Sequence, residues 1–125
     1  MVRIVFRWRS LVLSVVIPTL NAATTLAEVL DGFLPGLGEG DLEVIVVDGG
    51  SSDATCALAQ SGGANIISAP RGRGGQLSAG AKAARGDWLL FLHADTVLSA
   101  DWRDEAAHFM ANPGNTMRAG VFRLA

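Results

Sequence analysis

The chain has 125 residues, of which 50% are hydrophobic and 18% are charged, and its formal net charge is −2. This length and composition predict one folded domain over residues 1–125 and exclude a disordered or collagen-like chain. The slightly acidic balance argues against a nucleic-acid partner, which calls for a basic excess to neutralise phosphates. The single cysteine, Cys56, excludes a scaffold of internal disulfides and favours a reducing, cytoplasmic location.

Residues 1–10 carry three arginines ahead of an apolar stretch, a pattern that signal peptides share. This stretch is rich in β-branched residues, ends at Pro18 and lacks a small-residue cleavage site, which favours a buried strand over a leader. The longest apolar run, 11–17, is far shorter than the roughly 20 residues that a membrane-spanning helix needs. We therefore interpret residues 1–10 as an N-terminal extension and expect no transmembrane segment.

Apolar runs alternate with helical patterns along the chain. The apolar runs predict five strands, over 11–17, 42–47, 64–68, 88–92 and 117–124. The segments between them predict four helices, over 22–33, from Ser52 or Asp53 to about 60, over 76–85 and over 101–111. This alternation predicts an α/β fold, with a mostly parallel sheet and helices on both faces. Because such sheets bind ligands at the carboxyl ends of their strands, the polar segments 18–21, 48–51, 69–72 and 93–96 are candidate site segments.

Two carboxylates directly follow apolar strands. Asp48 could accept hydrogen bonds from a nucleobase or ribose, or it could form the turn that the sequence Asp-Gly-Gly-Ser-Ser-Asp favours. Asp95 offers a hard oxygen ligand that suits Mg²⁺ or Mn²⁺ beside a diphosphate. His93 could be a second ligand, better suited to Mn²⁺. For an isolated His-x-Asp, the alternative is a core histidine and a turn aspartate.

The glycine-rich segment 71–76 opens a predicted helix and carries Arg71 and Arg73. Helix N-termini attract anions and arginine binds phosphate oxygens through two hydrogen bonds, so this segment suits a phosphate group. The alternative is a surface loop. The segment lacks the third glycine of the dinucleotide-binding fingerprint, and the sequence contains neither a P-loop motif nor a cysteine cluster for structural zinc.

Taken together, three segments resemble motifs of the family 2 glycosyltransferases, whose GT-A fold is Rossmann-like and binds nucleotide sugars. Residues 15–21 (VVIPTLN) resemble the opening strand and turn, and residues 43–53 (EVIVVDGGSSD) resemble the second nucleotide-binding motif. Residues 86–95 (GDWLLFLHAD) resemble the stretch that ends in the metal-binding DxD. The sequence of segment 71–96 is also similar to that of a bacterial subgroup, the rSAM/selenodomain-associated transferases.

This resemblance implies a role for each matching position. It places the nucleotide on Pro18, Thr19, Asn21, Asp48 and Gly49, the diphosphate on Arg71 or Arg73, and the metal, Mn²⁺ or Mg²⁺, on Asp95 with His93. Gly49 stands where the family often has a second aspartate, which weakens an expectation of uridine specificity. His93 stands where the family has the first aspartate of the DxD.

The chain is shorter than the usual catalytic domain of the family, and no residue matches the family's catalytic base. We therefore expect a donor-binding domain for a nucleoside-diphosphate sugar, with an unidentified acceptor and inverting transfer in the intact enzyme. The alternative is a non-catalytic nucleotide-binding or assembly module. A nucleotidyltransferase is disfavoured, because the turn at 18–21 is not glycine-rich.

The C-terminal segment leads to an expectation about assembly. The predicted strand over 117–124 carries apolar residues on both sides, and the acceptor half that would cover it in the family is missing from this sequence. An uncovered apolar strand is normally blunted or buried. We therefore expect a two-fold homodimer, with this strand or the basic N-terminal segment at the interface.

Overall fold

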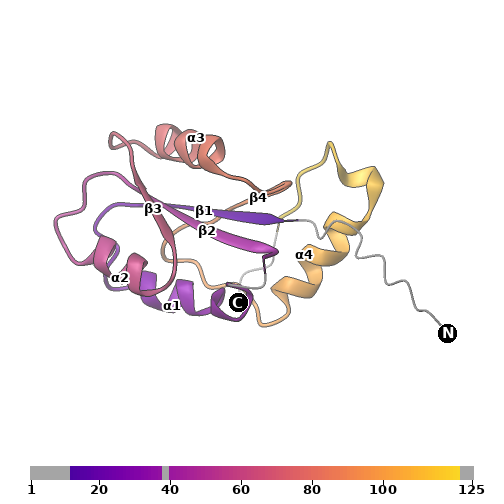
Figure 1. The fold of residues 1–125 in the computed structure, drawn as a ribbon, viewed down its shortest axis with the longest axis horizontal. Coiled ribbons are helices and arrows are strands. Elements are labelled where there is room, and N and C mark those ends of the chain that lie inside the picture. Colours follow the sequence, from indigo (N-terminus) through magenta and orange to yellow (C-terminus); the bar gives the residue numbers. More distant parts are fainter. Residues whose placement is uncertain (1–11, 38–39, 122–125) are drawn as a thin grey trace.

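The computed structural model describes residues 12–37 and 40–121, so the predicted extension over 1–10 lies outside the described residues. The described chain forms a sheet of four parallel strands (Figure 1): β1 (Leu13–Thr19), β2 (Leu42–Asp48), β3 (Asn65–Ser68) and β4 (Trp88–Phe91). Their order in the sheet is β3-β2-β1-β4. The four strands confirm the predicted parallel arrangement.

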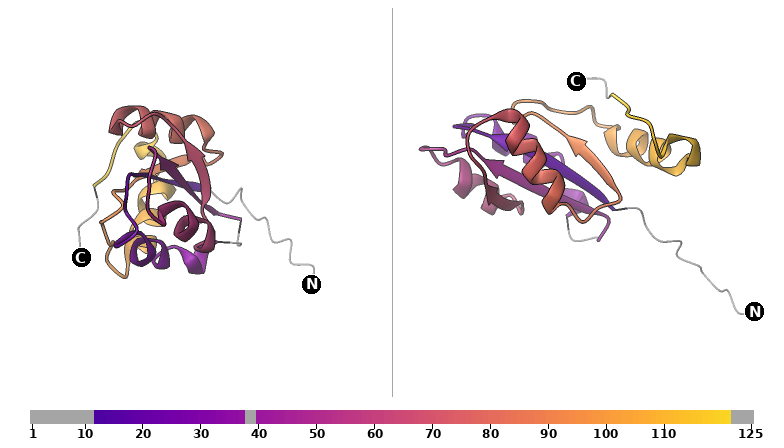
Figure 2. Two further views of the ribbon diagram at one scale, coloured as in Figure 1. Left: turned by 90° about the vertical axis from the view of Figure 1, so that its left-hand side faces the viewer. Right: turned by 90° about the horizontal axis from the view of Figure 1, so that it is seen from above.

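Four α-helices cover the sheet in the described part of the chain: α1 (Leu26–Asp31), α2 (Thr55–Ser61), α3 (Arg73–Ala83) and α4 (Trp102–Ala111). Two short 3₁₀ helices, η1 (Leu34–Gly36) and η2 (Pro113–Asn115), follow α1 and α4. Helix α3 lies on one face of the sheet, and α1, α2 and α4 lie on the other (Figures 1 and 2). This arrangement confirms the α/β class with helices on both faces. None of the helices in the described ranges has the length and apolar character needed to cross a bilayer.

The two central strands are buried on both faces, which explains why β1 and β2 read as continuous apolar runs. Val15, Ile17 and Val46 pack with the apolar side chains of α1 and α4. Val16 and Val47 point to the opposite face, towards α3. The main hydrophobic core therefore lies between the sheet and the α1–α4 layer.

Helix α3 approaches the sheet closely because it presents a glycine to it. A Cβ placed on Gly80 would lie 2.2 Å from Cγ1 of Val16, a separation that packed atoms do not tolerate. Gly80 is therefore required by packing. The close contact brings α3 near the two central strands.

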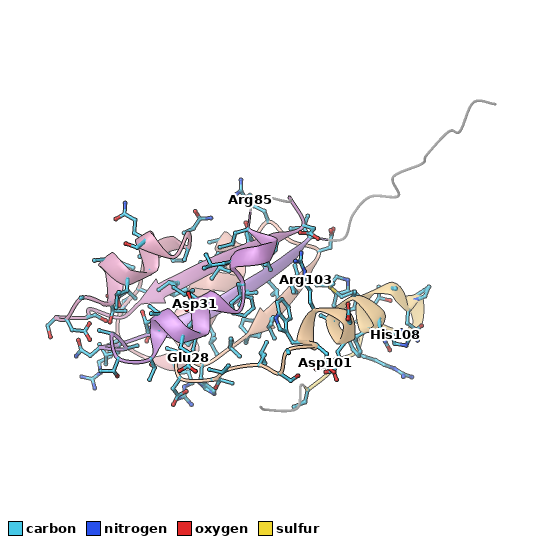
Figure 3. The ribbon with its side chains drawn as sticks, turned by 90° about the horizontal axis from the view of Figure 1, so that it is seen from below. Glu28, Asp31, Arg85, Asp101, Arg103 and His108 are labelled. Carbon is cyan, nitrogen blue, oxygen red and sulfur yellow. The ribbon has the colours of Figure 1, made fainter. Side chains whose placement is uncertain are left out.

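Trp102 and Arg103 attach helix α4 to the segments around α1 and the start of β2. The Trp102 ring packs edge-to-face on Phe33, with 5.0 Å between ring centroids, and Trp102 Nε1 donates to the carbonyl of Gly32 at 3.3 Å. Arg103 extends from α4 towards the sheet (Figure 3) and donates to both carboxylate oxygens of Asp41 at 3.1 Å. These contacts hold the segment after β4 against the core.

Two helix boundaries differ from the predictions. Helix α1 begins at Leu26 and not at residue 22. Residues 23–25 form a turn instead, in which the N–H groups of Thr25 and Leu26 both donate to the carbonyl of Ala22, at 3.1 and 2.9 Å. Helix α3 begins at Arg73 and not at residue 76. The φ of 149° at Gly72 turns the chain directly into the helix, so the following glycines are helical.

The predicted strand over 117–124 is wrong for residues 117–121, which form no strand; residues 122–124 lie outside the described residues. The backbone N–H of Arg118 donates to Asn115 at 2.9 Å, which continues the turn that follows η2 and leaves no extended partner for the sheet. Met117 and Val121 are 96% and 98% exposed. The homodimer expected from the sequence therefore loses the strand on which it was based.

Candidate functional site

A pocket of about 520 Å³ lies at the carboxyl ends of β1 and β4, between the start of α1 and the start of α3. Its volume falls within the roughly 300–1,000 Å³ that small-molecule sites occupy. Most of the predicted site residues line it together: Pro18, Thr19, Asn21, Arg71, Arg73, His93 and Asp95. Residues from three separate segments of the sequence thus converge on one cavity.

Asp48 and Gly49 do not line this pocket. Asp48 is buried, and both carboxylate oxygens are already hydrogen-bonded. Oδ1 accepts from Thr19 Oγ1 at 2.9 Å and from Ser51 Oγ at 2.6 Å, while Oδ2 accepts from the backbone N–H groups of Gly50 and Ser51 at 3.1 and 2.9 Å. This geometry matches the turn-forming alternative, and a nucleotide contact of Asp48 stays a prediction.

The pKa of Asp48 is set by two opposing effects. Burial raises the pKa of this carboxyl, whereas hydrogen bonds from Ser51, Thr19 and Gly50 stabilise the charged form and lower it. The hydrogen bonds outweigh burial, so the pKa lies below its ordinary value. Asp48 is therefore a carboxylate that anchors the β2–α2 turn.

Asn21 joins the two turns at this end of the sheet. It has a φ of 50°, in the left-handed region that asparagine tolerates better than most residues. Its Oδ1 accepts from the backbone N–H of Ser52 at 2.8 Å, and its own N–H donates to Ser51 Oγ at 2.8 Å. Asp53 adds a third link, because its Oδ2 accepts from the N–H of Ala23 at 3.1 Å. Three hydrogen bonds thus tie the β1–α1 wall of the pocket to the β2–α2 turn.

The opposite wall of the pocket carries positive charge. Arg71 and Arg73 flank Gly72 at the start of α3, and both side chains are exposed. Neither forms an ion pair with any carboxylate in the described ranges 12–37 and 40–121. No side chain caps α3, so its first backbone N–H groups also face the solvent at this end. Such an arrangement is suited to an anion.

The loop after β4 places Asp95 and His93 in the same pocket. Both residues are exposed, and the loop is fixed by Thr25 Oγ1, which donates to the carbonyl of Ala94 at 2.8 Å. Within the described residues, no three His, Cys, Asp or Glu side chains gather as a ligand set for a metal ion. A hard cation held by one or two side chains completes its coordination with phosphate oxygens and water. The donor set therefore fits a metal shared with a diphosphate.

Sequence reasoning missed three polar residues of the pocket, Thr24, Thr25 and Gln76. Thr25 lay within the predicted helix, where its contact with a distant loop leaves no local signal. Gln76 is 4% exposed. A signal for Gln76 exists in the sequence: it precedes Gly80 by one helical turn, so both occupy the sheet-facing side of α3.

Known proteins resemble this chain in sequence and in fold. The model of glycosyl transferase family 2 matches residues 14–124. A PGL/p-HBAD biosynthesis glycosyltransferase from Mycobacterium bovis (strain BCG / Pasteur 1173P2) is 38% identical over 105 residues, which cover 78% of this chain and 41% of that protein.

Two solved structures illustrate the shared fold. Glucosyl-3-phosphoglycerate synthase from Mycobacterium tuberculosis, in complex with Mn²⁺, uridine diphosphate and glucosyl-3-phosphoglycerate, superposes with a TM-score of 0.70 at 28% identity, over 83% of this chain and 41% of that chain. S. aureus TarS 1-349 superposes with a TM-score of 0.69 at 25% identity, over 79% of this chain and 32% of that chain.

The chain thus spans about two fifths of the length of the mycobacterial relatives, and less of TarS. Residues 14–124, which the family model matches, include all three motifs and every residue that lines the pocket. Since the family model covers residues 14–124, the chain belongs to glycosyl transferase family 2.

Proposed function

We propose that this chain binds the nucleoside-diphosphate sugar donor of a glycosyltransferase, together with Mn²⁺ or Mg²⁺. The observation that carries the proposal is the pairing of opposite charges across one pocket, with Arg71 and Arg73 on the α3 wall and Asp95 on the β4 wall. A diphosphate with a bound cation has the complementary charges, because the negative phosphates can face the arginines while the cation faces Asp95. The solved relative with Mn²⁺ and uridine diphosphate supports this choice of ligand.

In this proposal each wall has a distinct role. Arg71 and Arg73 bind the diphosphate oxygens, and Asp95 with His93 holds the cation. The cation supplies positive charge that stabilises the diphosphate as a leaving group. The base and ribose occupy the space beside Pro18, Thr19 and Asn21. The turn at Asp48 and Gly49 supports these three residues.

The reaction that we propose for a protein containing this domain is inverting glycosyl transfer. A deprotonated acceptor hydroxyl attacks C1 of the sugar, and the bond from C1 to the diphosphate breaks as the arginines stabilise the departing charge. The general base and the acceptor are not assigned to residues of this chain. The non-catalytic alternative predicts binding of the same donor without turnover.

Calorimetric titration of the chain with UDP, with and without Mn²⁺, tests the proposal. We expect Mn²⁺ to tighten UDP binding, and we expect Asp95→Asn to remove this dependence while Asp104→Asn, an exposed carboxylate of α4, keeps it. Absence of UDP binding under all conditions contradicts the donor site, and an unchanged Mn²⁺ dependence in Asp95→Asn contradicts the metal assignment.

The same titration separates the contribution of the arginines to UDP affinity from that of Asp95. The double variant Arg71→Ala/Arg73→Ala is expected to lose about 1.5–3 kcal/mol of UDP affinity per charge-assisted hydrogen bond, with little change for uridine. Lys82→Ala, at the other end of α3, is the matched control. Equal losses for UDP and uridine in the double variant would show that the arginines do not bind phosphate.

We also propose that the chain forms a homodimer through β4, which is an edge strand of the sheet formed by the described residues.

A further inference from the structure

Gln76 is a buried polar residue whose amide joins three segments. It is 4% exposed. Its Nε2 donates to the backbone carbonyls of Thr19 and Val47, at 2.9 Å each, and its Oε1 accepts from the backbone N–H of Gly72 at 3.1 Å. These partners belong to the end of β1, to β2 and to the segment that carries the two arginines.

The hydrogen-bonding capacity of the Gln76 amide is largely used by the protein itself. Both amide hydrogens bond to the two central strands, and the amide oxygen bonds to the residue between Arg71 and Arg73. Gly72 has a φ of 149°, so few other residues adopt its conformation. A bond to its N–H therefore fixes the backbone from which both arginines extend.

Gly49 leaves the space that the Gln76 amide fills. A Cβ at position 49 would lie 3.0 Å from both Nε2 and Oε1 of Gln76. This contact is tight, so any side chain at position 49 displaces the amide by a few tenths of an ångström. Gly49 and Gln76 are thus coupled: the absence of a side chain at one position permits the hydrogen bonds of the other.

We propose that Gln76 is a positioning residue, which ties the backbone between Arg71 and Arg73 to β1 and β2 and so holds both arginines at the place where they bind the diphosphate. The inference rests on the proposed donor-binding function. Gln76 itself binds the strands and the loop. Its removal is therefore expected to weaken binding of the phosphates selectively and to leave binding of the nucleoside largely unchanged.

The main variant is Gln76→Met, which keeps the length of the side chain and removes all three hydrogen bonds. Calorimetry with Mn²⁺ present is expected to show a UDP affinity that falls about tenfold or more relative to uridine affinity, the size of one or two lost charge-assisted bonds. Gln60→Met, on the exposed surface of α2, is the matched control and should leave both affinities unchanged. Parallel losses for UDP and uridine, or no loss, would overturn the proposal.

A second measurement needs no ligand. In the ¹⁵N-labelled chain, the heteronuclear NOE of residues 71–73 is expected to fall in Gln76→Met and to stay at the wild-type level in Gln60→Met. Unchanged NOE values would overturn the positioning role on their own. If wild-type chain fails to bind UDP, the donor-binding proposal fails and the phosphate role of Gln76 falls with it, whereas the NOE still reports whether Gln76 orders the segment.

If Gln76→Met fails to fold, Gly49→Ala tests the same hydrogen bonds of Gln76 with a smaller change, the addition of one methyl group beside the amide. We expect a smaller but equally selective loss of UDP affinity. In a Gln76→Ala background, where the space is empty, Gly49→Ala should have no further effect on UDP affinity. Additive losses in this double-mutant cycle would contradict the coupling of the two residues.

Discussion

Asp48 lies near the candidate site, but its carboxylate accepts hydrogen bonds from the protein and stabilises the fold. Because hydrogen bonds to Thr19, Gly50 and Ser51 outweigh the effect of burial, the pKa of Asp48 is lowered in the folded chain. A carboxyl with a lowered folded-state pKa stabilises the fold at any pH above its unfolded-state pKa. That contribution is lost as the pH falls from about 4 through the folded-state pKa.

The variant Asp48→Asn is therefore expected to reduce the free energy of unfolding at pH 7 by about 2–3 kcal/mol, since its amide group cannot accept from all four donors. Near pH 3 the difference from wild type should shrink, because the wild-type carboxylate is then losing its own contribution. Urea unfolding at the two pH values measures both quantities, with Asp104→Asn as the control. A difference that is as large at pH 3 as at pH 7 would contradict this account.

Among single residues, the sequence indicated which ones lie near the pocket better than what their side chains contact. Asp95 and Arg71 line the pocket, and they were identifiable as candidates because a strand end or a helix start is visible in a one-dimensional pattern. The hydrogen bonds of Asp48 and Gln76 depend on side chains that meet only after folding. For this reason the sequence left two alternatives open for Asp48 and assigned no role to Gln76.

Helix α3 contains glycines with opposite packing environments. Gly80 faces Val16 so closely that a Cβ would lie 2.2 Å from it, whereas a Cβ on Gly74 would meet nothing within 4 Å. The same substitution should therefore have opposite effects within one helix.

Gly80→Ala is expected to destabilise the fold by about 1–3 kcal/mol, the usual effect of overpacking a core. Gly74→Ala should be neutral or stabilise it by up to about 1 kcal/mol, because alanine restricts the unfolded chain more than glycine does. Urea unfolding without ligand compares the two variants directly. Equal changes of the same sign would show that α3 does not pack as closely as described.

Element boundaries were harder to predict than element types. The sequence predicted each of the four described strands and each of the four α-helices, because apolar runs mark the strands, and apolar periodicity, capping residues, alanine content or flanking glycines mark the helices. The start of α1 depends on the turn over 23–25 and the start of α3 on the φ of Gly72, which periodicity does not report. The predicted strand over 117–124 was wrong at 117–121 because apolar residues alone do not provide a pairing partner.

The strand order explains the position of the pocket in the whole molecule. From β1 the chain moves outward to β2 and β3, and then returns to place β4 on the other side of β1. Ligands bind parallel sheets at such a switch point, which here lies between the ends of β1 and β4. The sequence does not reveal strand order, so it grouped Asp48 on β2 with Asp95, although only Asp95 lies at the switch point.

Within residues 12–37 and 40–121, the same strand order leaves β4 at an edge of the sheet. Leu89 and Phe91 on this strand are 41% and 48% exposed, and a second cavity of about 500 Å³ adjoins them, lined in part by Trp88 and Phe109. An edge strand with exposed apolar side chains and unpaired backbone groups favours pairing with another strand. A two-fold axis beside β4 would pair it antiparallel with β4 of a second copy and cover Phe91 in both.

We therefore expect the weight-average mass of the chain to rise with concentration in the micromolar range, from 13.0 kDa towards twice that value. The variant Phe91→Lys should remain at the monomer mass, because a lysine at this edge places two like charges at the interface and removes its apolar area. Sedimentation velocity over a dilution series measures both chains, and urea unfolding of Phe91→Lys checks that the monomer is folded. A wild-type chain that stays at 13.0 kDa throughout the series would contradict the homodimer, and self-association that persists in Phe91→Lys would place the interface away from β4.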